Sequence, residues 1–316
     1  MRASAAQPGG RFFAIAAWRW IGWLVTAAVL CAVGAVILRS GGELSQCTWR
    51  IDPLRAMGAL AIVTGSYPLF ALAWRQALAA SGGSLSGRSA VRIYARSQLA
   101  RYLPGSLWNY IGRTMLCARE GIDRSAAVGS MVLENAAMVV SALLVFAATL
   151  PLWPTTLDRA LQPMLIVGAV VMLLLFHPAV FARIVRLAAR VTLSPVPTVD
   201  LSMRRLWAVG ASYIAAWCVL GAGFWAFAAS VHPLPLSSLP VLVGGGALAW
   251  TVGFLALVPC GLGVREAMAV AVLAMLVPAP VAAVIAVGFR LVQVVGELIW
   301  AAVAAGLHAP TQTQGA

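Results

Sequence analysis

Long apolar runs with few charged residues constrain this chain more than any other feature of its sequence. The shorter runs cover residues 20–38, 56–74, 125–150, 160–182 and 206–231. A longer apolar tract extends from 232 to 307 and is interrupted at 259–266 and at 278–280. About 20 apolar residues cross a bilayer as one helix. We therefore expect an all-α, polytopic transmembrane bundle of six to eight spans.

The composition supports this fold class and excludes one class of partner. Only 10% of the residues are charged and 62% are hydrophobic, whereas soluble domains carry about 25% charged residues. The net charge of +13 comes from 22 arginines without any lysine. Basic residues of membrane proteins gather on the cytoplasmic side, and no nucleic-acid recognition motif accompanies the charge. We expect no nucleic acid partner.

The arginines also predict the orientation in a bacterial cytoplasmic (inner) membrane. Residues 1–19, 75–124 and 183–205 hold sixteen of them, whereas the loops 39–55 and 151–159 hold four. The arginine-rich segments are therefore expected in the cytoplasm, and so is the short tail 308–316. The run 20–38 could instead be a signal peptide, but its length and the lack of a clear cleavage site favour a first transmembrane helix.

The reactive side chains give no sign of a cofactor. Five cysteines are widely scattered, and no pair has metal-ligand or redox spacing. Two arginine-bearing stretches, 88–103 and 182–193, place their arginines on one helical face, which is typical of a helix at the headgroups. The run Gly244-Gly245-Gly246 indicates close helix packing rather than a nucleotide loop.

Two regions, 101–140 and 256–300, have the same unusual layout. Each has a Pro/Gly break, a short segment, a second break and a long helix. A displacement of 156 residues places Ala126-Ala127-Val128 on Ala282-Ala283-Val284 and Glu134 on Arg290. We expect one transmembrane domain, 1–316, with repeat-like halves around 97–150 and 239–307.

The Pro/Gly breaks point to a transport site. They lie at Pro104-Gly105 and at Pro259, Gly261 and Gly263. Broken backbone survives in a bilayer only inside protein or beside a wet cavity, and a break at matching positions of two halves marks a binding site. If both elements are re-entrant, the halves are inverted. In the alternative, 239–258 and 265–277 are two full spans.

Charged residues inside the apolar runs add to this prediction. Glu134 and Arg290 each cost roughly 2.5–3.5 kcal/mol at the bilayer centre, and polar stripes surround both at helical spacing. The stripes are Ser130, Glu134, Ala137 and Ser141, and Arg290, Gln293 and Glu297. Arg290 could pair with Glu297 or Glu134 and lock the halves together, or both charges could line the path of an anionic headgroup. Arg113 and Arg265 are further phosphate donors.

These motifs resemble the lysylphosphatidylglycerol synthase transmembrane-region family of flippase-like membrane proteins. The first block is Tyr102-Leu103-Pro104-Gly105, Arg113, Arg119-Glu120-Gly121 and Glu134, and the second is Pro259-Cys260-Gly261-Leu262-Gly263-Val264-Arg265-Glu266 and Arg290. The resemblance implies a membrane domain that moves lipids between leaflets. Asn135 and Met138 depart from the family pattern, and no soluble aminoacyltransferase domain follows, so we expect no synthase activity.

We therefore predict a lipid flippase or translocase, not an enzyme, whose partners are membrane phospholipids with an anionic headgroup. The residues expected along the lipid path are Pro104, Gly105, Arg113, Glu134, Asn135, Pro259, Gly261, Gly263, Arg265, Glu266, Arg290 and Glu297. The alternatives are a small-solute transporter driven by protons through Glu134 or Glu297, and a non-catalytic partner of a lipid-synthesising enzyme. An intramembrane transferase would have to use Glu120, Asp123 or Glu266 and ranks last.

Overall fold

The computed structural model describes residues 51–100, 108–153, 202–256 and 261–307, together with Arg183 and Val258. The predicted spans 20–38 and 160–182 lie outside the described residues, and so does most of 182–193. The described parts of the chain form helices and contain no strand. The main helices are α3 (Pro53–Ala80), α4 (Gly87–Leu99), α5 (Trp108–Arg119), α6 (Arg124–Thr149), α9 (Met203–Val231), α10 (Leu239–Leu255), α11 (Val264–Leu273) and α12 (Ala279–Ala305). Two short 3-10 turns, η2 (Leu150–Leu152) and η3 (Leu236–Ser238), accompany them.

Five of these helical segments are long and apolar enough to cross a membrane. They are Pro53–Ala80, Arg124–Leu152, Arg204–Val231, Leu236–Leu255 and Ala279–Ala305. Four of them coincide with predicted runs, and the all-α bundle is confirmed.

Two long helices begin at acidic caps. Asp52 accepts hydrogen bonds from the backbone N–H groups of Leu54 and Arg55, at 3.0 and 3.1 Å, and so starts α3. Asp123 accepts from the N–H of Ser125 at 2.8 Å and starts α6. Hydrogen bonds from Ser125 lower the pKa of the exposed Asp123 carboxyl, which keeps this cap negative beside the positive helix end.

The helix boundaries repeat with the predicted displacement of 156 residues. α4 ends at Leu99 and α10 at Leu255, while α5 begins at Trp108 and α11 at Val264. α6 and α12 end at Thr149 and Ala305. The contacts repeat as well, because α4 packs against α12 as α10 packs against α6, and each short helix packs against the same neighbours of its own half. The two halves therefore have one architecture.

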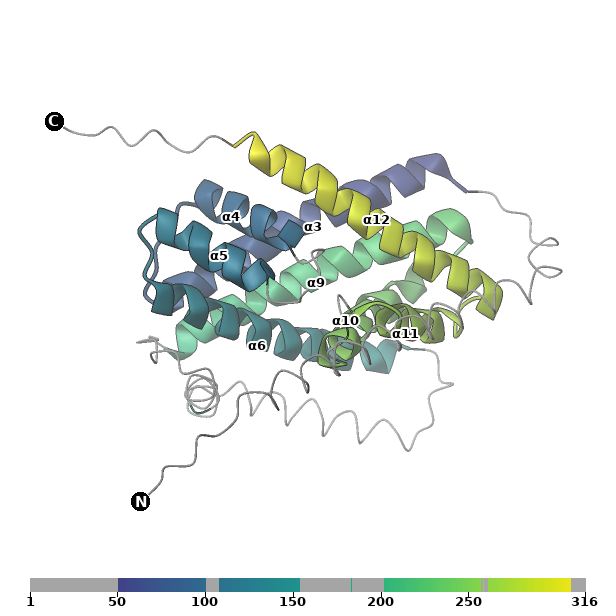
Figure 1. Ribbon diagram of the computed structural model, residues 1–316. Helices are drawn as coiled ribbons and strands as arrows, with labels where there is room; N and C mark the ends of the chain where they lie inside the picture. The colour runs from purple at the N-terminus through teal and green to yellow at the C-terminus, as the bar shows by residue number, and fades with distance from the viewer. Residues whose placement is uncertain are drawn as a thin grey trace, which may run out of the picture.

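The halves are inverted. The N–H of Asp52, before α3, donates to the carbonyl of Ser230 at the end of α9, at 2.9 Å. Near the opposite end, Gln76 donates to Ser212 at 2.8 Å. These contacts make α3 and α9 antiparallel, and in Figure 1 their equivalents α6 and α12 also run in opposite directions. The predicted inverted repeat is confirmed.

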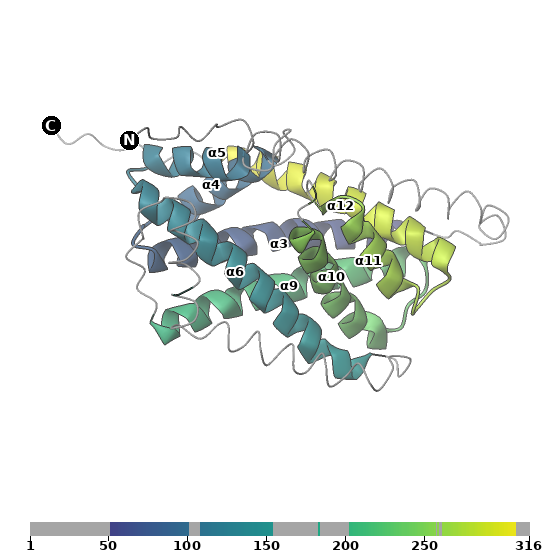
Figure 2. The same ribbon diagram turned by 60° about the horizontal axis from the view of Figure 1, so that its bottom comes forward.

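Each half contains a short helical hairpin, and the two hairpins lie toward opposite ends of the bundle. α4 and α5 pack together on the left of Figure 1, and α10 and α11 pack together on the right, as Figure 2 also shows. α11 has 10 residues, which gives about 15 Å at 1.5 Å per residue, half the hydrocarbon thickness. The tract 239–277 is therefore a hairpin that returns to the end from which it enters, and not two full spans.

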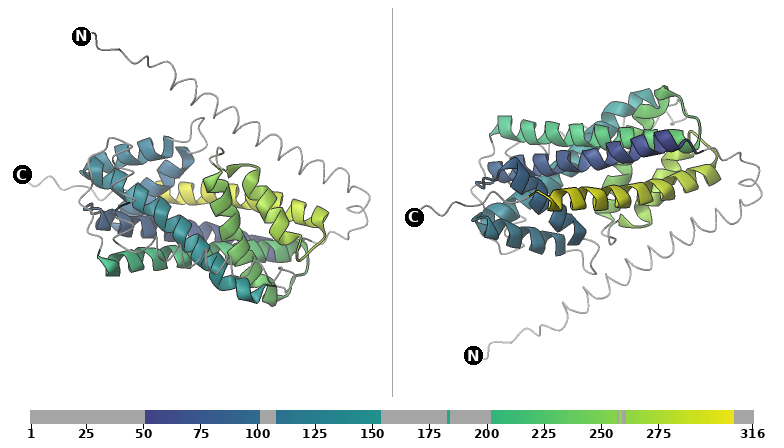
Figure 3. Two further views of the ribbon diagram at one scale, coloured as in Figure 1. Left: turned by 90° about the horizontal axis from the view of Figure 1, so that it is seen from below. Right: turned by 90° about the horizontal axis from the view of Figure 1, so that it is seen from above.

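The centre of the bundle is packed by α3, α9 and α12. Figure 3, right, shows these three helices side by side, with α3 in the middle. Trp74, Tyr213, Trp217 and Phe224 are among its largest fully or almost fully buried side chains. Polar side chains placed between these helices are consequently shielded from lipid.

The three glycines of 244–246 each face a different helix, as the packing interpretation predicts. A Cβ on Gly244 would lie 1.9 Å from Thr149 Oγ1, next to the end of α6, and one on Gly245 would lie 2.4 Å from Val272 of α11. One on Gly246 would lie 3.4 Å from Phe224 of α9. α10 approaches α6 and α11 closely because these positions have no side chain.

Candidate functional site

The first half contains a sealed ion pair. Arg113 of α5 binds Glu134 of α6 through Nη1 and Oε2. The two side chains are 3% and 4% exposed, so neither charge is compensated by solvent. Removing one partner of such a pair leaves a buried charge, which costs about 3–5 kcal/mol. This pair ties the return helix of the first hairpin to the following long helix.

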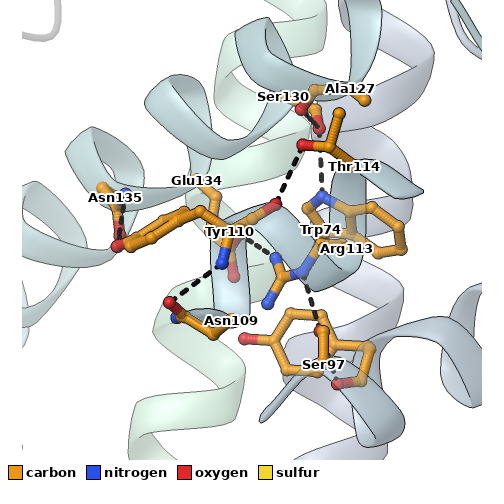
Figure 4. Close-up of polar contacts among 11 residues, drawn as sticks. Trp74, Ser97, Asn109, Tyr110, Arg113, Thr114, Ala127, Ser130, Glu134 and Asn135 are labelled. Atoms are coloured by element: carbon orange, nitrogen blue, oxygen red, sulfur yellow. Dashed lines mark hydrogen bonds and ion pairs between the residues drawn. The ribbon is translucent and has the colours of Figure 1, made fainter. Parts of the chain in front are cut away.

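Polar and aromatic neighbours complete the environment of Arg113. Its Nε donates to Ser97 Oγ at 3.0 Å. The guanidinium carbon lies 4.2 Å from the ring centre of Tyr94 and 5.0 Å from that of Trp74. Figure 4 shows the guanidinium between Glu134 and Ser97, with Trp74 beside it. A planar cation between two aromatic faces is held in one orientation.

A second contact joins the same two helices. Asn135 Nδ2 donates to Tyr110 Oη at 3.1 Å (Figure 4). Trp74 Nε1 donates to Ser130 Oγ at 3.1 Å and links α6 to α3. The first half is thus cross-linked by hydrogen bonds around its charge pair.

The second half contains a looser ion pair. Arg290 Nε of α12 lies 3.5 Å from Glu266 Oε1 of α11, and the side chains are 13% and 6% exposed. The other carboxylate oxygen of Glu266 accepts from the N–H of Gly263, the N-cap of α11. Glu266 Oε1 has no hydrogen-bond partner among the described residues. Arg290 Nε, at 3.5 Å, is therefore the cation that faces this buried oxygen.

A small cavity of about 30 Å³ lies beside this pair, and Arg265, Glu266, Arg290 and Gln293 line it together with apolar residues of α9 and α10. The apolar walls include Trp217, Leu220, Phe224 and Phe289. Two cations, one anion and an aromatic wall therefore meet at this cavity.

The glycines of the second break shape this site. Gly261 and Gly263 have φ values of +65° and +84°, which L side chains rarely adopt. A Cβ on Gly261 would also lie 3.2 Å from the backbone of Gly253 in α10. The turn into α11 therefore needs both glycines. Pro104, Gly105 and Pro259 lie outside the described residues.

The charge pairs differ from the expected ones. Among the described residues, Arg290 pairs with Glu266 and Glu134 pairs with Arg113. Glu134 does not line the cavity beside Arg290, and its own return helix supplies its partner. Each of these two long helices, α6 and α12, therefore takes its counter-charge from its own hairpin. Glu297 is buried at 6% exposure.

Sequence reasoning missed the aromatic part of both centres. Trp74, Tyr94 and Ser97 around Arg113, and Trp217 and Phe289 in the cavity wall, had no role assigned. Nothing local distinguishes Trp74 from the other eleven tryptophans. The amphipathic pattern of 88–103 was the only available signal, since Tyr94 and Ser97 lie on the face of α4 opposite its arginines.

The carboxylates proposed for a transferase have other roles. Glu120 binds Arg92, Asp123 caps α6 and Glu266 caps α11 and faces Arg290. Within the described ranges, no group of three or more His, Cys, Asp or Glu side chains could hold a metal ion.

Comparison with known proteins identifies one family. The sequence model of the family described as "Lysylphosphatidylglycerol synthase TM region" matches residues 14–301. No curated protein and no solved structure matches the chain.

Proposed function

Because the chain belongs to the lysylphosphatidylglycerol synthase transmembrane-region family, a family of membrane lipid metabolism or translocation, we propose that it moves a phospholipid between membrane leaflets. The cargo is a lipid with an anionic headgroup. The membrane is the bacterial inner membrane.

The observation that carries this proposal is the cavity of the second half. Arg265 and Arg290 line this cavity and carry donors for a phosphate group. Charged hydrogen bonds contribute about 1.5–3 kcal/mol each. The wall of Trp217, Phe224 and Phe289 suits the apolar part of a lipid next to its headgroup.

The difference between the halves supports a cycle of two states. Inverted repeats allow one half to move relative to the other between two conformations. In the described conformation the second half has the cavity, and the first half has a sealed pair. In the opposite conformation the second hairpin closes on Arg290, while the Arg113–Glu134 pair stays intact.

The orientation follows the arginines. The end of the bundle where α3 ends and α6 and α9 begin faces the cytoplasm, because the arginine-rich segments lie there. Both chain termini are then cytoplasmic, and the α10–α11 hairpin enters from the outer side.

The protein acts without catalysis in this proposal, and a proton-driven mechanism through Glu134 is disfavoured. Arg113 contacts the Glu134 carboxylate directly, and both side chains are buried. A carrier of protons needs a carboxyl group that can lose its partner at each turn of the cycle.

The experiment is a leaflet-exchange assay in proteoliposomes that contain fluorescent NBD-labelled phosphatidylglycerol or phosphatidylcholine. Dithionite quenches only the outer leaflet, so protein-dependent quenching of the inner pool reports translocation. We expect exchange that exceeds protein-free vesicles and is at least tenfold slower with Arg290→Gln, which removes a charged donor.

The matched control is Arg124→Gln, because Arg124 is exposed and its substitution changes the net charge equally. It should exchange lipid at the wild-type rate. Absence of exchange by the wild-type protein would refute the proposal, and lipid binding without exchange would favour a non-catalytic partner of a lipid enzyme.

A further inference from the structure

A cluster of arginines on the first hairpin takes no part in the proposed lipid path. Arg92 and Arg96 extend from α4, and Arg119 ends α5. With Ile93, Leu116 and Glu120 they line a second cavity of about 500 Å³, its open side included. We call the three basic residues the hairpin arginine cluster.

The hairpin arginine cluster has an excess of positive charge. Glu120 is the only acidic residue that lines this cavity. It is already occupied, because Arg92 binds one carboxylate oxygen and Ser89 Oγ lies 3.2 Å from the other. Among the described residues, Arg96 and Arg119 have no carboxylate partner. Two guanidinium groups therefore line one cavity without a carboxylate partner in the described part of the chain.

The surroundings differ from those of an ordinary solvated arginine face. The side chain of Arg92 is 11% exposed and is fixed by Glu120. Ile93 is 2% exposed and packs into the core beneath the cavity. Arg88 and Arg124 belong to the same hairpin region, but both are exposed and neither lines the cavity. Arg96 and Arg119 are exposed as well, but they line this cavity beside the nearly buried Arg92. The cluster is thus a concave site, and Arg88 and Arg124 are arginines of similar exposure outside it.

We propose that the hairpin arginine cluster binds a phosphate oxyanion, with the headgroup of an anionic phospholipid or a soluble phosphate as its source. Guanidinium groups bind phosphate through paired hydrogen bonds. Arg96 and Arg119 come from the two arms of the hairpin, so one bound phosphate connects α4 with α5. It thereby stabilises the hairpin that carries Arg113. This site lies in the half opposite the cavity of the proposed function and does not depend on it.

The test uses detergent-solubilised full-length protein and dihexanoyl-phosphatidic acid, whose phosphate monoester is exposed. Dihexanoyl-phosphatidylcholine is the zwitterionic comparison, and inorganic phosphate tests the soluble source. Binding is measured by native mass spectrometry and by the shift in melting temperature. The variant is Arg96→Gln with Arg119→Gln, and the matched control is Arg88→Gln with Arg124→Gln.

We expect the cluster variant to bind phosphatidic acid at least tenfold more weakly, since it loses two charged donors that line the cavity. The control should stay within about twofold, since neither Arg88 nor Arg124 lines the cavity. If inorganic phosphate binds without lipid, and binds more weakly to the cluster variant, the ligand is a soluble phosphate. If inorganic phosphate at millimolar concentration does not displace phosphatidic acid, the ligand is the lipid headgroup.

Equal weakening of phosphatidic acid binding in both variants would show a general charge effect and would overturn the proposal. Unchanged binding in both variants would also overturn it. The exposed side chains of Arg96 and Arg119 predict that the cluster variant keeps the melting temperature of the ligand-free protein. Arg290→Gln should leave this binding unchanged, so failure here and failure of lipid translocation are separate results.

Discussion

The two halves of the molecule share one architecture and hold opposite arrangements of charge. In the first half the cation, Arg113, is on the return helix of the hairpin and the anion, Glu134, is on the long helix. In the second half the anion, Glu266, is on the return helix and the cation, Arg290, is on the long helix. Glu134 and Arg290 occupy positions 156 residues apart.

The two centres also differ in packing. In the first centre the two charged side chains are in direct contact, and Ser97 and two aromatic rings surround the guanidinium group. In the second centre Arg290 Nε and Glu266 Oε1 are 3.5 Å apart and a cavity lies beside them. A repeated scaffold therefore holds one structural ion pair and one pair that remains accessible. The same position in two repeats can differ in role when its partner differs.

The largest effect is expected from Arg113→Gln. This change leaves Glu134 buried without its counter-charge, and the free energy of unfolding should fall by about 3–5 kcal/mol. Titration with a denaturing detergent, followed by tryptophan fluorescence, measures the change. Arg290→Gln should lower it less, because the Arg290–Glu266 pair is 3.5 Å apart and Glu266 keeps its hydrogen bond from the N–H of Gly263. Similar losses in both variants would remove the distinction between the centres.

A smaller effect is expected where the second hairpin packs against α6. Gly244→Ala places a Cβ 1.9 Å from Thr149 Oγ1, and such overpacking destabilises by about 1–3 kcal/mol. Gly246→Ala is the matched control, because its Cβ would meet Phe224 at an ordinary 3.4 Å. Melting temperatures in one detergent should fall for the first variant only. The position of the first hairpin equivalent to Gly244, 156 residues earlier, is Arg88. The first hairpin contacts α12 through aromatic rings such as those of Tyr94 and Trp300.

The smallest expected effect is a difference in stability between the Tyr110→Phe and Tyr213→Phe variants. Tyr110→Phe removes the hydrogen bond with Asn135 and should destabilise by about 1 kcal/mol. The hydroxyl of Tyr213 is buried and has no hydrogen-bond partner in the described part of the chain, so Tyr213→Phe should be neutral or stabilising. The same detergent titration resolves the two. A larger loss for Tyr213→Phe would indicate a polar contact that this account lacks.

Much of the fold could be predicted because it depends on local pattern. Apolar length predicted α3, α6, α9 and α12, and the Pro/Gly breaks with the 156-residue displacement predicted two hairpins. Apolar length alone could not show whether the tract 239–277 forms a hairpin or two full spans, since α10 is as apolar as a full span. The end of α11 at Leu273 shows that the second helix is too short for a full span.

The candidate site was predicted only in its residue types. Glu134 and Arg290 were identified as unusual charges inside apolar runs, and Arg113 and Glu266 as residues of the expected lipid path. Their pairing could not be predicted, because helical spacing shows which face a residue occupies but not which helix lies opposite. The cavity wall, with Trp217 and Phe289, depends on contacts between α9 and α12 that no short-range pattern records.

The central claim is that the second ion pair serves lipid movement and the first serves structure. Exchanging the charges tests it most directly, with Arg113→Glu/Glu134→Arg in one protein and Glu266→Arg/Arg290→Glu in another. Leaflet exchange of labelled phosphatidylglycerol is measured per folded protein in proteoliposomes. We predict that the first exchange retains most translocation once folded, and that the second lowers it at least tenfold although the protein remains folded. The account would be contradicted if the Glu266→Arg/Arg290→Glu protein translocated lipid at the full rate while the folded Arg113→Glu/Glu134→Arg protein did not.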